Sequence, residues 1–263
     1  MKISFIGAGN MGSAIIGGIV SSALAKPCDV TVADRDNDKL KGISAQYGVN
    51  ITTSNTDCLD CDMLFLCVKP NVIYNVIDEI KDAVSNDTII VSIAAGQSIK
   101  KMTDAFGKSV KIIRVMPNTP ALVGEGMAAL ALGDTVTRTE AQAVLEIFNS
   151  IGKAEIVPES LMDTVTALSG SSPAYVFMFI DAMVEMATKS GMEREQALTF
   201  AAQAVLGSAK MVMETGISPE ELKQNVCSPG GTTIEAVAVF EKEDLYGMVD
   251  RAMKACEDKS RKM

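Results

Sequence analysis

Short runs of apolar and β-branched residues alternate with helical patterns over the first 157 residues. The runs that we expect to form strands are Lys2–Ile6, Val30–Asp34, Val49–Thr52, Met63–Val68, Thr88–Ser92, Lys111–Met116 and Met127–Leu132. Two segments, Met63–Val68 and Ile89–Ile93, are apolar on both faces, as in the central strands of a parallel sheet that helices cover on either side. The pattern therefore predicts a doubly wound α/β domain over residues 1–157.

The pattern changes at Pro158, after which strands stop and long helical patterns follow. The expected helix from Pro173 to about Lys189 is apolar on almost all sides, and the segment Ala197–Met213 is similar. A helical domain over residues 158–263 cannot easily bury two such helices by itself. A purely internal core is the alternative, but we expect a subunit interface and hence an obligate homo-oligomer.

Composition and charge exclude several classes of function. The formal charge of −9, without a long basic run, argues against nucleic acid as a partner. Histidine is absent, which removes the commonest general base, the usual nitrogen ligand of metals and any serine–histidine pair. The first apolar stretch is too short for a signal peptide, and no later run approaches the roughly 18 residues of a membrane span. We expect a cytoplasmic protein that binds neither a membrane nor a metal.

Six cysteines allow either a disulfide framework or small buried side chains in a reducing compartment. Cys67 lies inside an expected strand, which favours the second interpretation. Cys58 and Cys61 have CxxC spacing, but the chain has no second CxxC and no histidine to complete a tetrahedral zinc site. We interpret this spacing as coincidence, with zinc binding or a redox role as the alternatives.

The residues that follow the first expected strand match the pattern GxGxxG. In this pattern the glycines allow a tight turn, the approach of backbone to a pyrophosphate and the close packing of a helix on a strand. We therefore expect a dinucleotide to bind at Gly7, Gly9, Asn10, Met11 and Gly12, with its phosphates on the amides of the helix start. A structural glycine turn that binds nothing is the alternative.

The second expected strand ends at Asp34, where an acid commonly binds the ribose hydroxyls of an adenine nucleotide. Adjacent Arg35 could instead pair with a 2′-phosphate, so NADPH and NADH both remain open. The carboxyl ends of the later strands should line the same crevice, and they carry Val68, Lys69, Pro70, Ala94, Ala95 and Asn118. Lys69 is the charged member of this set, although a solvated lysine at a strand end would give the same pattern.

Two segments of the helical region join small polar residues to an expected helix start. They are Ser169–Tyr175, with the sequence SGSSPAY, and Ser228–Thr233, with the sequence SPGGTT. Both are typical of helix starts that bind an anion through backbone amides. Ordinary capping by serine and threonine, without any ligand, is the alternative for each segment.

Five motifs together resemble the pyrroline-5-carboxylate reductase family: GAGNMG at 7–12, VKP at 68–70, RVMPNTP at 114–120, SGSSPAY at 169–175 and SPGGTT at 228–233. The resemblance covers both predicted domains and implies a Rossmann-like N-terminal domain followed by a helical dimerisation domain. It also implies the last step of proline biosynthesis, the reduction of L-1-pyrroline-5-carboxylate to L-proline, with NADPH slightly favoured over NADH. Ser172 departs from the family's usual glycine, and Asp34 from the neutral residue that many members have.

The resemblance further implies roles for individual residues. Arg35 and Asn55 resemble cofactor contacts, and Lys69 and Ala95 lie near the cofactor in the family. The substrate carboxylate is implied to bind at Ser228, Gly230, Gly231, Thr232 and Thr233. Thr233 is implied to be the catalytic hydrogen-bond donor. Family members form dimers through the helical domain, and some assemble further into decamers.

The implied chemistry does not need histidine. An imine carbon accepts hydride readily once its nitrogen is protonated or hydrogen bonded, so a donor near that nitrogen, a carboxylate clamp and a well-placed nicotinamide are sufficient. The rival enzyme is a β-hydroxyacid dehydrogenase of similar layout, which would use a lysine such as Lys189 or Lys210, but neither has the accompanying motif. A dinucleotide sensor without catalytic activity is the rival from another class, and the intact SPGGTT segment argues against it.

Overall fold

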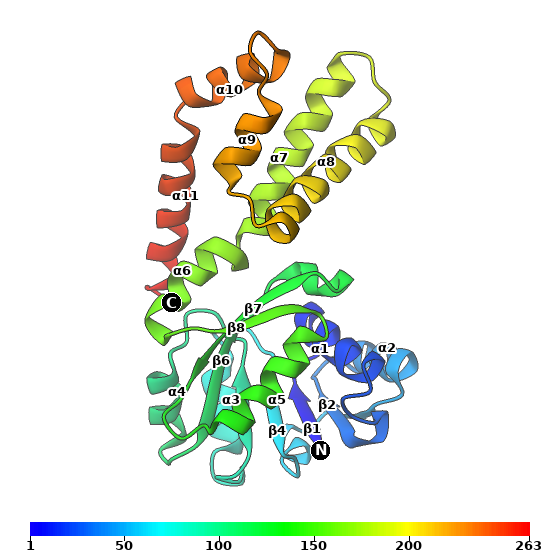
Figure 1. The fold of residues 1–263 in the computed structure, drawn as a ribbon. Coiled ribbons are helices and arrows are strands. Elements are labelled where there is room, and N and C mark those ends of the chain that lie inside the picture. The colour runs from blue at the N-terminus through cyan, green and yellow to red at the C-terminus, as the bar shows by residue number, and fades with distance from the viewer. The chain divides into compact units, whose positions relative to one another are not determined.

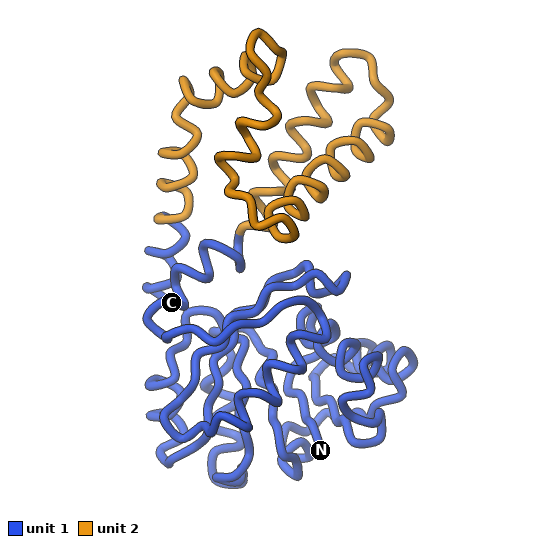
Figure 2. The backbone as a smooth tube through the Cα atoms, in the orientation of Figure 1, with its two compact units in different colours: residues 1–171, 255–263 blue, residues 172–254 orange.

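The computed structural model describes residues 1–263, which fold into two compact units (Figure 1, Figure 2). Unit 1 comprises Met1–Ser171 together with Ala255–Met263, and unit 2 comprises Ser172–Lys254. This division lies 14 residues beyond the boundary after residue 157 that the change of pattern suggested, and it returns the end of the chain to the first unit.

Contacts explain why the residues just beyond 157 remain with the sheet. Met162 is buried against Ala129 and Ala131 of the seventh strand. The Ser260 hydroxyl donates a hydrogen bond to Asp163 Oδ1 at 2.7 Å, which ties the end of the chain to the same region. Unit 1 therefore includes two segments, residues 158–171 and Ala255–Met263, that the hydrophobic pattern alone assigns to the helical domain.

Unit 1 is built on a single eight-stranded sheet with the order β3-β2-β1-β4-β5-β6-β7-β8. The strands are β1 (Ile3–Ile6), β2 (Val30–Ala33), β3 (Asn50–Thr52), β4 (Met63–Leu66), β5 (Ile89–Ser92), β6 (Lys111–Met116), β7 (Gly126–Leu132) and β8 (Gly152–Ile156). All seven strands predicted from the sequence are confirmed. β8 is an additional strand that the pattern did not predict.

One pair of strands departs from the parallel arrangement that we expected. β6 and β7 are antiparallel, with Ile113 opposite Leu132 and Met116 opposite Ala129, whereas every other neighbouring pair is parallel. Residues 117–125 alone connect these two strands, and a parallel crossover needs about a dozen residues or more. The expectation of a parallel sheet is therefore wrong at this pair, because the connection is too short for a crossover helix.

Helices cover both faces of the sheet, as a doubly wound domain requires. α1 (Asn10–Ser21), α2 (Asn37–Tyr47) and α5 (Arg138–Asn149) pack on one face, whereas α3 (Ile73–Ile80) and α4 (Ile99–Phe106) pack on the other. Consecutive strand residues alternate between the two cores: Phe65 joins the first, while Leu64 and Leu66 join the second. The apolar character of β4 on both faces is thus explained by burial on both sides.

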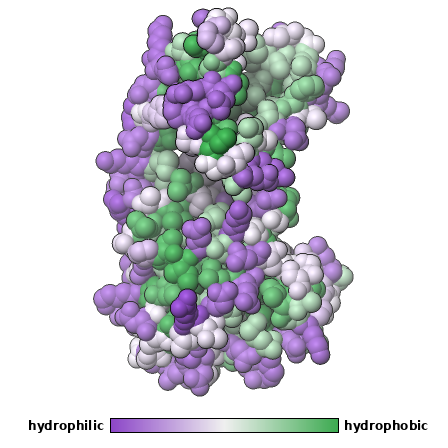
Figure 3. Space-filling model, viewed as in Figure 1, coloured by the Kyte–Doolittle hydropathy of each residue, from purple (hydrophilic) through white to green (hydrophobic).

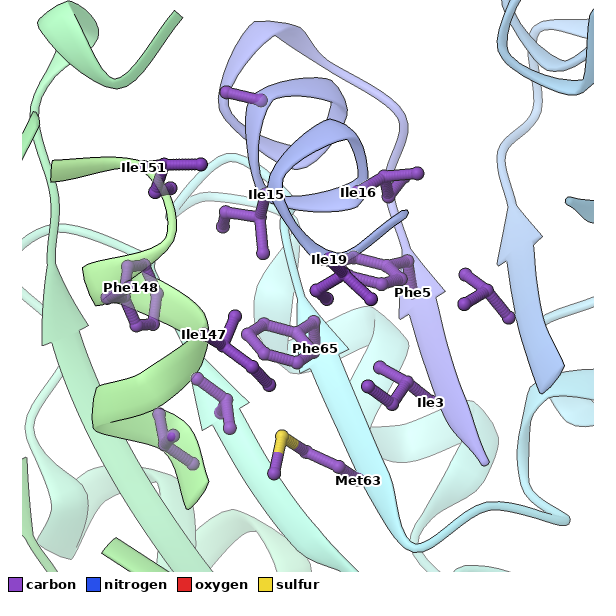
Figure 4. Close-up of a cluster of buried hydrophobic side chains, with 14 of the residues drawn as sticks. Ile3, Phe5, Ile15, Ile16, Ile19, Met63, Phe65, Ile147, Phe148 and Ile151 are labelled. Atoms are coloured by element: carbon purple, nitrogen blue, oxygen red, sulfur yellow. The ribbon is translucent and has the colours of Figure 1, made fainter. Parts of the chain in front are cut away.

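The larger core contains a stack of aromatic rings (Figure 4). Phe5 of β1 lies opposite Phe65 of β4, and their ring centroids are 4.6 Å apart. Phe148 of α5 packs near this pair, with its ring centroid 6.3 Å from that of Phe65. The stack joins β1 to β4, the two strands whose carboxyl ends carry Gly7 and Val68.

Unit 2 is entirely helical, in agreement with the sequence. Its helices are α7 (Ser172–Lys189), α8 (Arg194–Thr215), α9 (Pro219–Val226), α10 (Thr232–Lys242) and most of α11 (Leu245–Ser260). The remaining elements lie in unit 1 and are short: 3₁₀ turns at Pro27–Asp29, Asn55–Cys58, Thr119–Val123 and Glu159–Leu161, α6 at Met162–Val165 and a π-helix at Thr166–Gly170.

Unit 2 buries few of its apolar side chains. Its buried cluster consists of Val184, Ala197 and Ala201. In contrast, Phe177 and Met178 of α7 are 61% and 73% exposed, and apolar side chains reach the surface in the space-filling view (Figure 3). A surface of this kind is costly in water and is typical of a region that packs against another protein subunit.

A helical stretch at Glu159–Lys189 is long and apolar enough to cross a membrane, by length and composition alone. The expectation that no apolar run approaches this length is therefore wrong. Only 11% of its most apolar window is buried within the chain. A helix that packs against a second subunit passes the same test, because it too is apolar on most of its sides.

Candidate functional site

The glycine loop between β1 and α1 has a geometry that only glycine permits at two of its three positions. Gly7 has φ +104°, and a Cβ there would collide with the carbonyl oxygen of Cys67. A Cβ on Gly12 would lie 2.7 Å from the carbonyl oxygen of Gly7. Gly9 differs, since its φ of −75° suits any residue and a Cβ would meet no atom within 4 Å. Glycine at position 9 therefore keeps space open in front of the loop.

The first turn of α1 presents backbone amides without a side-chain cap. Four other helices of this chain begin with a side chain that accepts hydrogen bonds from the first-turn amides: α2, α4, α5 and α9 use Asp36, Ser98, Thr137 and Ser218. α1 has Gly9 at this position, with no side-chain cap and no acid in its first turn. The amides that begin at Asn10 are thus available to an anion, which a dinucleotide pyrophosphate would provide.

The Asp34 carboxylate holds the glycine loop. Its Oδ2 accepts a hydrogen bond from the Ala8 amide at 2.7 Å, and its Oδ1 accepts one from the Asp36 amide at 2.9 Å. Each oxygen therefore already has a backbone partner, and the loop is tied to the end of β2. Binding of an adenine ribose by this residue stays a prediction, and it would have to share these oxygens.

Arg35 and Asn55, which the resemblance assigns to the cofactor, converge on a residue that the sequence did not indicate. Arg35 Nη2 lies 3.6 Å from Glu79 Oε1, and Asn55 Nδ2 donates to Glu79 Oε2 at 2.5 Å. The three residues come from the end of β2, the start of the 3₁₀ turn after β3, and α3. No local motif marks Glu79, because an exposed glutamate on a helix is an ordinary surface residue.

Most of the other expected cofactor residues emerge at the same edge of the sheet as the glycine loop. Val68, Lys69 and Pro70 follow β4, while Ala94 and Ala95 follow β5. These strands and β1 are parallel neighbours, so their carboxyl ends meet. Lys69 is exposed, and its ammonium group makes no hydrogen bond or ion pair within the chain.

Asn118 is occupied by internal contacts. Its Oδ1 accepts a hydrogen bond from the Met127 amide at 2.8 Å, and its Nδ2 donates to the Ser169 carbonyl at 3.0 Å. The side chain is nearly buried and joins the segment after β6 to the start of β7 and to the π-helix. Its geometry supports a structural role, so a direct contact with a cofactor stays a prediction.

The SGSSPAY segment contains a helix start, as we expected, but it also includes the end of the preceding π-helix. Residues up to Gly170 form the π-helix, and α7 begins at Ser172. The Ser171 hydroxyl lies 3.2 Å from the sulfur of Cys256, and the Ser169 hydroxyl donates to the Val165 carbonyl at 3.2 Å. Ser171 forms a bend between the π-helix and α7, and Pro173 lies in the first turn of α7, where proline is common. Binding of an anion at this helix start stays a prediction.

The SPGGTT segment has the expected geometry of an open helix start. The Gly231 amide donates to the Ser228 carbonyl at 2.9 Å, and Gly230 has φ +70°, as in a type II turn with proline at its second position. A Cβ on Gly231 would lie 2.5 Å from Ser228 Oγ and 3.0 Å from the Ser228 carbonyl oxygen, so a side chain there would displace the Ser228 hydroxyl. α10 then begins at Thr232 without a side-chain cap.

The hydroxyl groups of this segment are not used inside the chain. Ser228, Thr232 and Thr233 make no side-chain hydrogen bond with other residues of the protein. Capping by serine or threonine, which was the alternative for this segment, is therefore not what α10 shows. Three hydroxyls and the first amides of α10 are together available to a small anionic ligand.

The cysteines and acids do not assemble into a metal centre in the structure. No group of three or more candidate ligands is close enough to hold an ion, and all six cysteines are free. Burial raises the pKa of Cys58 to about 12 and that of Cys61 to about 11. Both CxxC thiols are therefore protonated at neutral pH and are poor nucleophiles. Cys227, next to the SPGGTT segment, is partly exposed.

Comparisons with known proteins match both parts of the chain. The family model described as "Pyrroline-5-carboxylate reductase dimerisation" matches residues 159–263, and the one described as "NADP oxidoreductase coenzyme F420-dependent" matches residues 2–96. The chain is 47% identical over 263 residues to pyrroline-5-carboxylate reductase of Escherichia coli K12. The aligned region covers 100% of this chain and 98% of that protein.

Two solved structures are similar over the same length. The pyrroline-5-carboxylate reductase of Coxiella burnetii has a TM-score of 0.92 and 34% identity, and the Plasmodium falciparum pyrroline carboxylate reductase with NADP bound has a TM-score of 0.89 and 33% identity. Each covers 99% of this chain, which covers 97% of each of them. The match of the C-terminal region to a dimerisation domain indicates that the protein is a homo-oligomer. With identity that extends through both units, the chain belongs to the pyrroline-5-carboxylate reductase family.

Proposed function

We propose that this protein uses NADPH or NADH to reduce the C=N bond of L-1-pyrroline-5-carboxylate, forming L-proline. The observation that carries the proposal is that each unit contains a glycine-led helix start that no side chain caps, α1 in unit 1 and α10 in unit 2. One suits the pyrophosphate of a dinucleotide, and the other suits a small carboxylate. The rival functions, a hydroxyacid dehydrogenase and a dinucleotide sensor, do not explain the uncapped start of α10.

The dinucleotide would bind along the carboxyl edge of the sheet in unit 1. Gly7, Gly9 and Gly12 shape the loop, and the amides from Asn10 and Met11 onward bind the pyrophosphate. The remaining residues assigned to this site are Asp34, Arg35, Asn55, Val68, Lys69, Pro70, Ala94, Ala95 and Asn118. When bound, the reduced nicotinamide supplies a hydride to the imine carbon. NADPH is slightly favoured, since one matched domain is described as an NADP oxidoreductase and a related structure has NADP bound.

The substrate would bind at the start of α10. Amides of Gly230 and Thr232, together with the Ser228 hydroxyl, would hold the carboxylate without a salt bridge. Gly231 would shape the turn that presents them, because its own amide donates to the Ser228 carbonyl. Thr233 would donate a hydrogen bond to the ring nitrogen and stabilise the positive charge that makes the adjacent carbon electrophilic. Since a ring imine can take its proton from solvent, a weak donor such as threonine is sufficient and histidine is not required.

We further infer that the homo-oligomer is a dimer formed through the helices of unit 2, with association of dimers into a decamer as the larger state. The exposed apolar side chains of α7 and α8 support this interface. A cytoplasmic location, and the absence of membrane and nucleic-acid partners, belong to the same proposal. The charge of −9 supports the last of these.

The activity itself is tested by following the absorbance of the reduced nicotinamide with pyrroline-5-carboxylate, with a panel of hydroxyacids and with cofactor alone. We expect rapid oxidation of NADPH or NADH only when the cyclic imine is present. Turnover of hydroxyacids instead would support the rival dehydrogenase. Binding of the cofactor without any turnover would support the sensor.

Gly9→Ala should weaken cofactor binding without disturbing the fold. The backbone at Gly9 accepts alanine and the new methyl group meets no protein atom, but it would occupy the space in which the pyrophosphate approaches the loop. We expect the Kd for NADPH to rise by about tenfold or more in a fluorescence titration. Gly42→Ala is the matched control, since a Cβ at Gly42 also meets nothing within 4 Å but lies in α2. Equal affinities in the two variants would contradict the assignment.

Thr233→Ala should lower turnover while the fold and cofactor binding are retained. Loss of one hydrogen bond to the reacting nitrogen is expected to reduce kcat by roughly 10- to 100-fold. Thr233→Ser, which restores the hydroxyl, should recover most of this loss. The measurement is steady-state kinetics beside a cofactor titration. Unchanged kinetics in the alanine variant would remove Thr233 from the mechanism.

Met178→Glu should dissociate the oligomer. This side chain of α7 is exposed in the single chain, so glutamate is tolerated there, but its charge would be buried at the proposed interface at high cost. We expect light scattering to give the mass of one chain at micromolar concentration. Gln142→Glu, an equal charge change on the exposed side of α5, should leave the oligomer intact. An unchanged mass for the Met178 variant would place the interface elsewhere.

A further inference from the structure

Glu79 lies where Arg35 and Asn55, two residues assigned to the cofactor, meet. Its carboxylate accepts the Asn55 hydrogen bond through Oε2 and faces the Arg35 guanidinium through Oε1. The Arg35 and Glu79 side chains are 78% and 45% exposed, so the group is open to a ligand. A cation, an amide and an anion from three separate elements thus share one surface.

The Asp34 carboxylate, at the end of β2, already has hydrogen-bond partners. Asp34 uses both oxygens to hold backbone amides of Ala8 and Asp36, so it is tied to the loop itself. In this fold the end of β2 meets the ribose of the adenine nucleotide, and the group on its 2′ carbon distinguishes the two cofactors. Arg35, the residue after Asp34, and its partner Glu79 are therefore placed to contribute to discrimination at that carbon.

We propose that Glu79 is a specificity-determining residue that disfavours the 2′-phosphate of NADPH relative to the 2′-hydroxyl of NADH. This assignment rests on the proposed dinucleotide site. A 2′-phosphate is strongly anionic at neutral pH and must compete with the Glu79 carboxylate for Arg35, while the two anions repel each other. A free 2′-hydroxyl is neutral and can donate a hydrogen bond to a carboxylate.

The solvent exposure of Arg35, Asn55 and Glu79 limits how strongly Glu79 can change the relative affinity for the two cofactors. All three residues contact solvent, so the repulsion is screened by water and by salt. A several-fold change in relative affinity is therefore expected, rather than a complete switch of cofactor. The effect should also shrink as ionic strength rises, because the Debye length falls from about 10 Å at 0.1 M salt to about 3 Å at 1 M.

The test is Glu79→Gln, which keeps the shape of the side chain and removes its charge. Dissociation constants for NADP⁺ and NAD⁺, and for the fragments 2′,5′-ADP and 5′-ADP, are measured by isothermal titration calorimetry on the full chain. We expect NADP⁺ and 2′,5′-ADP to bind about three- to tenfold more tightly in the variant, and the unphosphorylated ligands to change by less than about twofold. The gain should diminish at high salt.

Asp78→Asn is the matched control. It removes one negative charge from the same helix, but its carboxylate pairs with Lys81 at 2.5 Å and not with Arg35. We expect no change in the ratio of NADP⁺ to NAD⁺ affinity in this variant. An equal change of ratio in both variants would mean that net charge, and not the position of Glu79, is responsible, and would overturn the assignment.

Two further outcomes separate this inference from the proposed function. If the wild-type protein binds both dinucleotides and Glu79→Gln weakens NADP⁺ or leaves the ratio unchanged, Glu79 either positions Arg35 for the phosphate or has no part in the choice, and the assignment fails alone. If the wild-type protein binds neither dinucleotide, the proposed function fails and the assignment fails with it. Thermal unfolding of both variants checks that the fold is retained.

Discussion

The backbone of Gly7 is held between two neighbouring strands, and the geometry of the cofactor edge depends on this constraint. The Gly7 amide donates to the Ala33 carbonyl of β2 at 2.8 Å, while the Cys67 amide donates to the Ile6 carbonyl at the same distance. The Cys67 carbonyl lies so close that no side chain fits on Gly7. The chain must therefore turn sharply as it leaves β1. The start of α1 is brought to the sheet edge at which β2 and β4 also end.

Much of the fold could be predicted because strand and helix patterns are local properties. The apolar runs marked seven strands, but β8 was not found, since Lys153 and Glu155 interrupt it and it lies at the edge of the sheet. The reversal between β6 and β7 was also missed. A strand has the same alternation in either direction, so its orientation depends on the length of the connection and not on the strand itself.

The site was predictable to the extent that its residues form continuous motifs. The glycine loop and SPGGTT both have the backbone geometry that their sequences indicate. The partners of Asp34 and Asn55 could not be read from the sequence, because these hydrogen bonds join residues 26 and 24 positions apart. The helix start in the SGSSPAY segment was also predictable, because serine, glycine and proline are usual there. The π-helix that precedes it was not predicted, since its hydrogen bonds leave no distinct pattern in the sequence.

The small buried cluster of unit 2 has a thermodynamic consequence. With only Val184, Ala197 and Ala201 buried in that cluster, the isolated chain gains little from its own packing there, and the exposed side chains such as Phe177 gain only by association. Folding of this region and assembly are then parts of one coupled equilibrium. The stability of unit 2 is not a constant of the chain, because it increases with the concentration of protomers by mass action.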